Sequence, residues 1–157
     1  MKIKLLTIGK TDSRPLQQLI DEYCKRLGFY IPFSMDTIPD IKNTKNLTTK
    51  QQKIAEGKEL LKKIEKSDAV ILLDENGKLY NSIQFSTYLQ KKMNSGLKKI
   101  VFVIGGPYGF SDDLYNRCNG KVSLSPMTFS HQMVRLFFTE QLYRSFTILK
   151  NEPYHHH

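Results

Sequence analysis

The stretch Ile100-Val101-Phe102-Val103-Ile104-Gly105-Gly106-Pro107-Tyr108-Gly109 joins an apolar run to a glycine-rich turn. A short apolar run of this kind is typical of a strand buried on both faces, as in a parallel sheet covered by helices. Glycines directly after a strand let bare backbone approach a ligand closely and offer N–H donors. Taken alone, however, the glycines fit a tight turn with positive φ angles better than a binding loop. The segment therefore predicts an α/β fold and marks one strand end as a candidate site.

The same strand signal recurs on either side of this segment, and helical patterns separate the strands. Strands are expected at residues 2–8, 33–38, 69–73, 100–104 and 122–124. The first helix is expected from Pro15 to Leu27, with Gly28 as a left-handed cap, and the second from a capping box, formed by Thr48 with Gln51 or by Thr49 with Gln52, to about Lys66. Three further helices are expected to begin at serine caps: from Ser82 to Gly96, from Ser111 to about Arg117, and from Ser130 to about Leu149. Residues 39–46 are expected to form a mobile loop. This alternation predicts one α/β domain over residues 1–157, with a largely parallel sheet flanked by helices.

The charge balance indicates a polyanionic partner. The 157 residues hold 24 Lys and Arg against 15 Asp and Glu, a formal net charge of +9. Residues 42–66 are the most basic stretch, with eight Lys and three Glu. Lysines gain affinity by displacing counterions from a phosphate backbone, so nucleic acid is the first partner to consider. Lysines that merely keep the chain in solution are an equally good explanation of the charge alone.

The number of cysteines and the length of the apolar runs argue against a disulfide-bonded secreted protein and against a membrane-spanning one. Cys24 and Cys118 are far apart and no apolar leader precedes the first strand, so we expect a cytoplasmic protein without disulfides. The longest apolar runs, such as 69–73, are far shorter than the roughly 20 residues of a membrane-spanning helix. We therefore expect no membrane partner.

Three strand ends are candidates for chemistry. In an open α/β sheet, ligands bind outside the carboxyl ends of the strands. The relevant segments are Leu73-Asp74-Glu75-Asn76-Gly77, the glycine loop Gly105–Gly109 and Leu124-Ser125-Pro126-Met127-Thr128-Phe129. If the three strands are neighbours, these segments form one site.

Familiar nucleotide and metal motifs are missing. The glycine spacing is GGxxG rather than GxGxxG, and no acidic residue occurs from Leu114 to Thr139 to hold a ribose, which argues against NAD. Gly9-Lys10-Thr11 resembles the end of a P-loop, but Lys4 stands where that motif requires glycine. Cys24, Cys118 and His131 show no metal-ligand spacing, so no metal is expected.

The segment 127–135 places His131 and Arg135 near a helix start, where anions are favoured. Glu140, Tyr143 and Arg144 follow on the same helix. His131 is equally understandable as an ordinary first-turn histidine, and Glu140 with Arg144 as a simple i, i+4 ion pair.

Taken together, these segments resemble the RlmH family, small SPOUT-class methyltransferases that act on a pseudouridine of bacterial 23S rRNA. The resemblance covers essentially the whole chain and is carried by residues 2–10, 23–27, 73–78, 102–109, 124–135, 140–144 and 151–155. It implies an α/β knot, in which the C-terminal segment threads through a loop and the trefoil knot itself forms the site for S-adenosylmethionine. Sequence periodicity gives no sign of such a knot, which is a rare exception to the rules of chain connection.

The resemblance also implies roles for particular residues and partners. The cofactor contacts of the family correspond here to Leu73, Gly105, Leu124, Ser125, Pro126, Met127, Thr128 and Phe129. The family is homodimeric, with each active site completed by the partner chain, and its substrate is 23S rRNA, here expected within the assembled ribosome; DNA is not an expected partner.

The catalytic candidates are Arg144, Tyr154 and His155. The N3 atom of a uracil-type ring carries a proton, so we expect His155 as base or proton acceptor and Arg144 as stabiliser of the ring anion. Tyr154 acts with them or stacks on the base. His131 and Arg135 are expected to shape the cofactor loop or contact phosphate.

Two departures from the family pattern concern Ser130, where the family often has proline, and the C-terminus, where a basic residue or two usually follows Tyr-His. Serine caps helices well, so the first should matter little. Terminal histidines are typical of a purification tag, so we assign no role to His156 and His157. Two other classes stay open on the residues alone: a basic RNA-binding module without catalysis, and a flavodoxin-like binder of phosphate or flavin.

Overall fold

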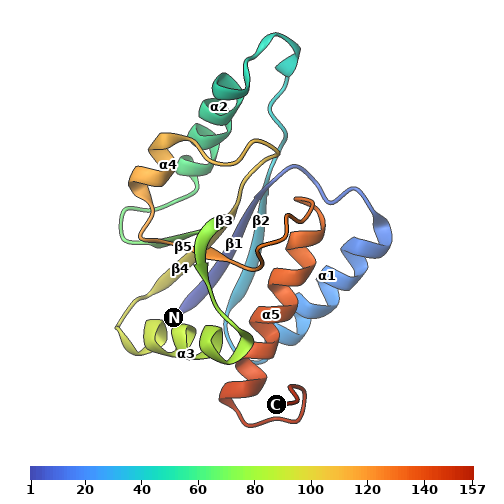
Figure 1. Cartoon of the computed structure of the whole chain (residues 1–157), viewed down its shortest axis with the longest axis vertical. Helices are drawn as coiled ribbons and strands as arrows, with labels where there is room; N and C mark the ends of the chain where they lie inside the picture. Colours follow the sequence, from blue (N-terminus) through green and yellow to red (C-terminus); the bar gives the residue numbers. More distant parts are fainter.

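A computed structural model describes all residues, 1–157, as one sheet covered by helices on both faces (Figure 1). In chain order the elements are β1 (Lys2–Ile8), α1 (Arg14–Leu27), β2 (Phe33–Ile38), the 3-10 helix η1 (Thr44–Asn46), α2 (Thr49–Lys62), β3 (Ala69–Leu79), α3 (Ser82–Asn94), β4 (Lys99–Ile104), α4 (Asp112–Arg117), β5 (Gly120–Ser123) and α5 (Met133–Leu149). All strand pairs are parallel, in the order β2-β1-β4-β3-β5. The expected α/β class and parallel sheet are confirmed.

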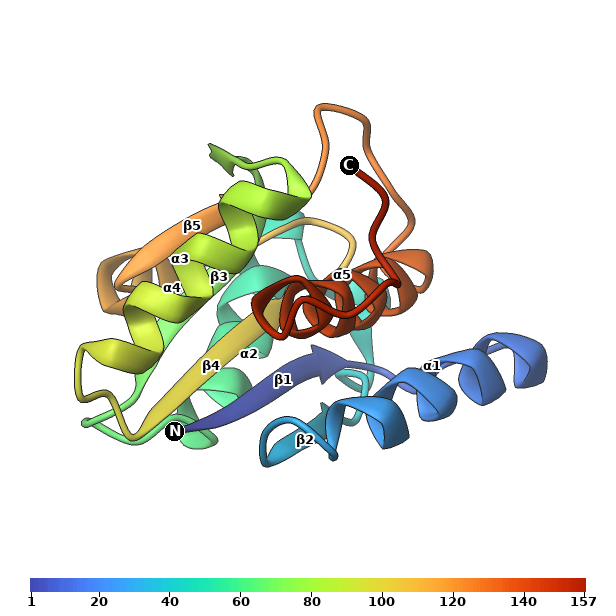
Figure 2. The ribbon, with the colours of Figure 1, turned by 90° about the horizontal axis from the view of Figure 1, so that it is seen from below.

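Strand residues alternate between two apolar cores, one on each face of the sheet. Ile100 and Phe102 of β4 face α1, α3 and α5, whereas Val101 and Val103 face α2 and α4. Figure 2 shows α1, α3 and α5 along one side of the sheet, with α2 beyond it. Because every strand position is covered, the central strands are continuously apolar, which is why their sequences are so easily recognised.

The β3 strand is longer than its sequence predicts. It continues to Leu79 instead of ending at Leu73, and Val122 of β5 is paired with both Leu73 and Lys78. The polar residues between them bulge out of the ladder. A Cβ atom on Gly77 would lie 2.7 Å from the backbone of Val122, so the bulge needs glycine there. The predicted end of this strand at Leu73 is therefore wrong, because the polar, turn-forming residues after it form a bulge within the strand.

Several helix ends also differ from expectation. The α2 helix ends at Lys62 rather than Lys66, and its capping box is the Thr48–Gln51 pair. Asn81, not Ser82, caps α3, through a second capping box with Gln84. Gly28 has a right-handed backbone, so it is not the expected left-handed cap.

The segment 39–46, expected to be a mobile loop, contains the short helix η1, and its mobility stays a prediction. The Ser130 cap is confirmed in part: its Oγ accepts a hydrogen bond from Met133 N at 3.0 Å, although regular α5 begins only at Met133. Capping signals thus locate helices to within a few residues.

Arg135 fastens the start of α5 to the end of β1. Its side chain is 1% exposed, and its guanidinium donates hydrogen bonds to Ile8 O at 2.7 Å and Gly9 O at 2.8 Å. Further bonds reach His131 O and Thr11 Oγ1. The side chain is therefore an internal link, and the expectation that Arg135 contacts phosphate is wrong. The same contacts draw the C-terminal segment across the sheet; its threading as a trefoil knot stays a prediction.

The sheet order brings the three candidate segments together. β4, β3 and β5 are neighbours and parallel, so their carboxyl ends meet at one edge. None of the helices combines the length and the apolar character that crossing a membrane would demand.

Candidate functional site

A cavity of about 640 Å³ opens at the carboxyl ends of β3, β4 and β5. Its walls are the start of the β3 bulge, the glycine loop from Gly105 to Phe110, and the segment between β5 and α5. Lys53 of α2 reaches its rim. Of the residues expected to contact the cofactor, Leu73, Gly105, Leu124, Ser125, Met127, Thr128 and Phe129 line this cavity, and Pro126 does not.

The glycine loop needs glycine for two reasons, a positive φ angle at one position and the lack of room for a Cβ atom at the others. Gly109 has a φ of +83°, and its N–H donates to Gly106 O at 3.2 Å, so the loop folds back on itself. Gly106 has no unusual φ, but a Cβ atom there would lie 2.3 Å from a carboxylate oxygen of Glu56. A Cβ on Gly105 would lie 3.1 Å from the Phe110 ring. The positive φ that a tight turn predicts is therefore confirmed only at Gly109, and close packing explains the other two glycines.

The opposite wall is held by short polar bonds. Ser123 Oγ donates to Ser125 O at 3.0 Å, and Met127 N donates to Ser125 Oγ at 2.9 Å. Thr128 Oγ1 donates to Glu75 Oε2 at 3.2 Å, which ties this segment to the β3 bulge. The wall is thus preformed around Ser125, and Met127, which also lines the cavity, is 74% exposed.

The cavity is acidic although the chain is basic. Asp74, Glu75 and Asp112 line it, against the single lysine Lys53. The Tyr115 hydroxyl donates to Asp74, and burial followed by this bond raises the pKa of Tyr115 far above its ordinary value, so the phenol keeps its proton. An acidic cavity favours a cationic ligand over a neutral or anionic one.

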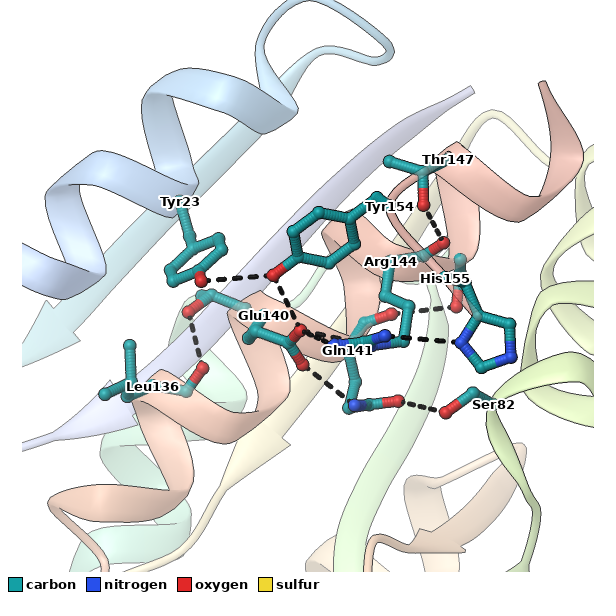
Figure 3. Close-up of polar contacts among 11 residues, drawn as sticks. Tyr23, Ser82, Leu136, Glu140, Gln141, Arg144, Thr147, Tyr154 and His155 are labelled. Atoms are coloured by element: carbon teal, nitrogen blue, oxygen red, sulfur yellow. Dashed lines mark hydrogen bonds and ion pairs between the residues drawn. The ribbon is translucent and has the colours of Figure 1, made fainter. Parts of the chain in front are cut away.

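The three catalytic candidates lie together in a second place, on α5 and the C-terminal tail (Figure 3). Arg144 pairs with Glu140 at 2.6 Å, and its Nη1 lies 3.2 Å from Nδ1 of His155. Tyr154 donates to the same Glu140 oxygen at 2.9 Å, and the guanidinium of Arg144 lies 4.7 Å from the centre of its ring. We call these four residues the α5–tail cluster. The simple i, i+4 pairing of Glu140 with Arg144 is confirmed, but it is one part of a larger network.

Two further contacts extend the α5–tail cluster. The Tyr23 hydroxyl of α1 lies 3.2 Å from the Tyr154 hydroxyl, and Gln141 bridges Glu140 to Ser82 through bonds of 2.8 and 2.7 Å. Tyr23, Gln141 and Ser82 were not predicted as site residues. Only side-chain geometry across separate helices shows their part, because nothing in local sequence spacing links them.

Protonation states in the α5–tail cluster follow from these contacts. Burial first, then the bonds with Tyr23 and Glu140, raise the pKa of Tyr154 well above its ordinary value, so its hydroxyl stays a donor. Loss of hydration and the nearby charges of His157 and Arg144 lower the pKa of His155. His155 is therefore neutral near pH 7. Since arginine can only donate, Nδ1 of His155 accepts from Arg144 and the imidazole proton lies on Nε2.

A smaller cavity of about 360 Å³ lies between the acidic cavity and the α5–tail cluster. It is lined by Glu140 and Gln141 of α5, by Tyr80, Phe85 and Phe137, and by Leu124 and Phe129 of the first cavity's wall. None of Arg144, Tyr154 and His155 lines the acidic cavity of the same chain. His131 does line it, whereas Tyr143 packs against the rings of Tyr23 and Tyr154.

No group of three or more His, Cys, Asp and Glu side chains is arranged to hold a metal ion. The groups that the acidic cavity and the α5–tail cluster present are backbone amides, carboxylates, a guanidinium, an imidazole and phenols. Such groups bind, orient and move protons.

A family profile described as "Predicted SPOUT methyltransferase" matches residues 1–155. The chain belongs to the SPOUT methyltransferase family. Within it the relatives are ribosomal RNA large subunit methyltransferases H, and the RlmH resemblance is confirmed. Those of Flavobacterium psychrophilum and Flavobacterium johnsoniae are 68% and 67% identical, each over 99% of both chains, and that of Parabacteroides distasonis is 58% identical over the same share.

Among solved structures, the SpoU methyltransferase AviRb from Streptomyces viridochromogenes, crystallised with AdoMet, aligns with a TM-score of 0.44 at 9% identity. The alignment covers 96% of this chain and 61% of AviRb. This similarity is too low to support a conclusion. Family membership itself favours an enzyme over the non-catalytic RNA-binding module and over the flavodoxin-like binder.

Proposed function

We propose that this chain is a methyltransferase of large-subunit ribosomal RNA that uses S-adenosylmethionine and methylates N3 of a pseudouridine in 23S rRNA on the assembled ribosome. The observation that carries the proposal is the cavity at the ends of β3, β4 and β5. It gathers seven of the eight residues expected to contact the cofactor, in a chain 68% identical to a ribosomal RNA large subunit methyltransferase H.

The acidic lining supports the cofactor assignment. S-adenosylmethionine supplies an electrophilic methyl carbon on a positively charged sulfur, which leaves as a neutral thioether. Asp74, Glu75 and Asp112 favour that positive charge, and the glycine loop and the wall around Ser125 offer backbone amides and close apolar contacts. These residues bind and orient; none needs to act as a nucleophile.

The α5–tail cluster supplies the proton chemistry. When N3 attacks the methyl carbon, its N–H bond must break and the ring carries negative charge on the way. Arg144 stabilises that charge by turning from Nδ1 of His155 towards a ring oxygen. The same movement frees Nδ1, which accepts the N3 proton. Glu140 and Tyr154 hold Arg144 in reach of both positions.

We further propose that the active site is shared between two copies of the chain. The α5–tail cluster of one chain does not line that chain's own acidic cavity. Met127, Met133 and Phe137 next to that cavity are 74%, 39% and 38% exposed, a concentration of apolar surface that a partner would cover. A homodimer would place the α5–tail cluster of one protomer over the cavity of its partner.

The lysine-rich segment 42–66 is proposed to attract rRNA. It holds eight lysines, and α2, its only long helix, reaches the rim of the acidic cavity through Lys53. Contacts to phosphate release counterions, so binding should weaken steeply with salt. A ribosomal substrate supports a cytoplasmic location for the protein.

The test is transfer of labelled methyl from S-adenosylmethionine to intact ribosomes that lack the modification, followed by mapping of the product nucleoside. Label on N3 of a 23S pseudouridine is the expected result. Cofactor binding without label on any ribosomal RNA would contradict the substrate assignment. Ribosome binding without any cofactor binding would instead indicate an RNA-binding module without catalysis.

A further inference from the structure

Glu56 of α2 is a buried carboxylate with no assigned role. It is 4% exposed, and its Oε1 is the only buried side-chain N or O atom without a hydrogen-bond partner. Burying a carboxylate oxygen without a hydrogen-bond partner costs free energy, so its presence in a folded chain needs an explanation. The neighbouring Glu59, whose side chain is 41% exposed, shows the contrast, since it pairs with Lys62 at 2.7 Å.

Glu56 lies directly behind the glycine loop. A Cβ atom on Gly106 would lie 2.3 Å from Glu56 Oε2 and 2.8 Å from Oε1, and Gly106 itself lines the acidic cavity. The next residue, Gly57, packs equally closely against Ser111, because a Cβ atom on Gly57 would lie 2.3 Å from Ser111 Oγ. The helix is therefore fixed against both ends of the loop. Only a residue without a side chain separates the carboxylate from the cavity.

The protein environment of Glu56 disfavours its charged form. Burial, and secondarily the negative charge of Asp40, raise the pKa of Glu56, and the hydrogen bond with Gln52 opposes this only in part. A positive charge in contact with Gly106 would relieve that penalty, because opposite charges attract strongly where water is excluded. A neutral ligand in the same position would not.

We propose that Glu56 is a specificity-determining residue of the cofactor site, whose buried negative charge favours the cationic methyl donor over its neutral product. The proposal rests on the assigned use of S-adenosylmethionine. The donor carries one more positive charge than S-adenosylhomocysteine and otherwise has nearly the same shape, so contacts of shape alone barely separate them. Once the methyl group has left, the attraction to Glu56 is lost, and the spent cofactor is released more readily.

The test is calorimetric titration of Glu56→Gln with three ligands: S-adenosylmethionine, S-adenosylhomocysteine and sinefungin, which carries an ammonium group in place of the sulfonium. Glutamine keeps the shape and removes the charge. We expect about tenfold weaker binding of the two cationic ligands, the equivalent of one pKa unit of interaction, and less than a twofold change for S-adenosylhomocysteine. Glu59→Gln, on the exposed side of the same helix, should bind all three like the unmodified chain.

Equal weakening for all three ligands would overturn the proposal and leave Glu56 a purely structural residue, and so would no weakening. If Glu56→Gln fails to fold in a thermal melt, Glu56→Asp replaces it. Aspartate keeps the charge and should preserve the preference for cationic ligands, and loss of that preference with the fold intact would overturn the proposal. An unmodified chain that binds the donor but methylates no rRNA contradicts only the proposed substrate, whereas one that binds none of the ligands contradicts both proposals.

Discussion

The acidic cavity and the α5–tail cluster are built in different ways. The cavity is lined mainly by three short continuous segments at the ends of three neighbouring strands, with further residues from α2 and α4. The α5–tail cluster is made by side chains from α5 and the tail, joined by Tyr23 from α1, 131 residues from its partner Tyr154. A site of the first kind tolerates side-chain changes that keep the backbone path. A site of the second kind depends on individual atoms, so single substitutions should separate binding from chemistry.

The largest effect is expected from Arg144→Ala. Loss of a charged donor that stabilises a developing anion costs about 10²–10³-fold in rate. Binding of S-adenosylmethionine should change little, because Arg144 does not line the acidic cavity of its own chain. Methyl transfer to ribosomes and calorimetry of the cofactor measure the two separately.

Arg144→Lys is the matched variant, since it keeps the charge but loses the bidentate geometry, and we expect intermediate activity. Parallel loss of cofactor binding and activity in Arg144→Ala would contradict the separation of cofactor binding in the acidic cavity from proton chemistry in the α5–tail cluster.

A large effect on stability, rather than on chemistry, is expected from Arg135→Met. The change leaves Ile8 O and Gly9 O without their buried donor, and the free energy of unfolding should fall by about 3 kcal/mol. Denaturant unfolding measures the change. Arg14→Met, at the exposed start of α1, is the control and should stay near the unmodified chain. If Arg135→Met weakened ribosome binding while the fold kept its stability, the side chain would contact phosphate after all.

A smaller loss is expected from Gly106→Ala. The new methyl group would collide with the carboxylate of Glu56, and the resulting strain should lower stability by about 1–3 kcal/mol and weaken cofactor binding. Gly96→Ala is a useful comparison, because its Cβ meets open space but its φ is +80°. Gly96→Ala should reduce stability through backbone strain alone and leave cofactor binding intact.

The double variant Gly106→Ala with Glu56→Ala separates collision from any other effect of the methyl group. Removing the carboxylate makes room, so the two changes together should be less damaging than their sum. Strict additivity would show that the alanine at 106 acts without touching residue 56.

The sequence predicts the cavity far better than the α5–tail cluster. Apolar runs locate all five strands, and the rule that ligands bind at carboxyl strand ends selects three segments that do form one cavity. The errors of the strand prediction are local: the polar stretch after Leu73 resembles the end of a strand, because bulges and turns use the same residue types. The roles of the three catalytic candidates rest on the chemistry of the reaction that the family resemblance implies, and they stay predictions.

The sequence does not predict the roles of residues whose contacts lie on distant segments of the chain. Glu56 belongs to a lysine-rich helix, and its neighbours suggest a solvated face; only the packing of α2 against Gly106 shows that it is buried. Arg135 looks like an anion-binding residue near a helix start, but its guanidinium turns inward to the backbone of β1. Local patterns give the position of a side chain along its helix, whereas its partner depends on how distant elements pack.

The smallest effect is expected in the pH dependence of methyl transfer. The pKa of His155 is lowered from its ordinary value of 6.5, so the neutral imidazole that accepts the N3 proton persists to more acidic pH. Activity should therefore decline at a lower pH than an ordinary histidine would impose, because protonation fills Nδ1 and disrupts its contact with Arg144. His155→Asn should lose this acidic limb, whereas His156→Ala, exposed and without a hydrogen bond to Arg144, should keep it. An unchanged limb in His155→Asn would assign the titration to another group and leave Arg144 as the principal catalytic residue of the α5–tail cluster.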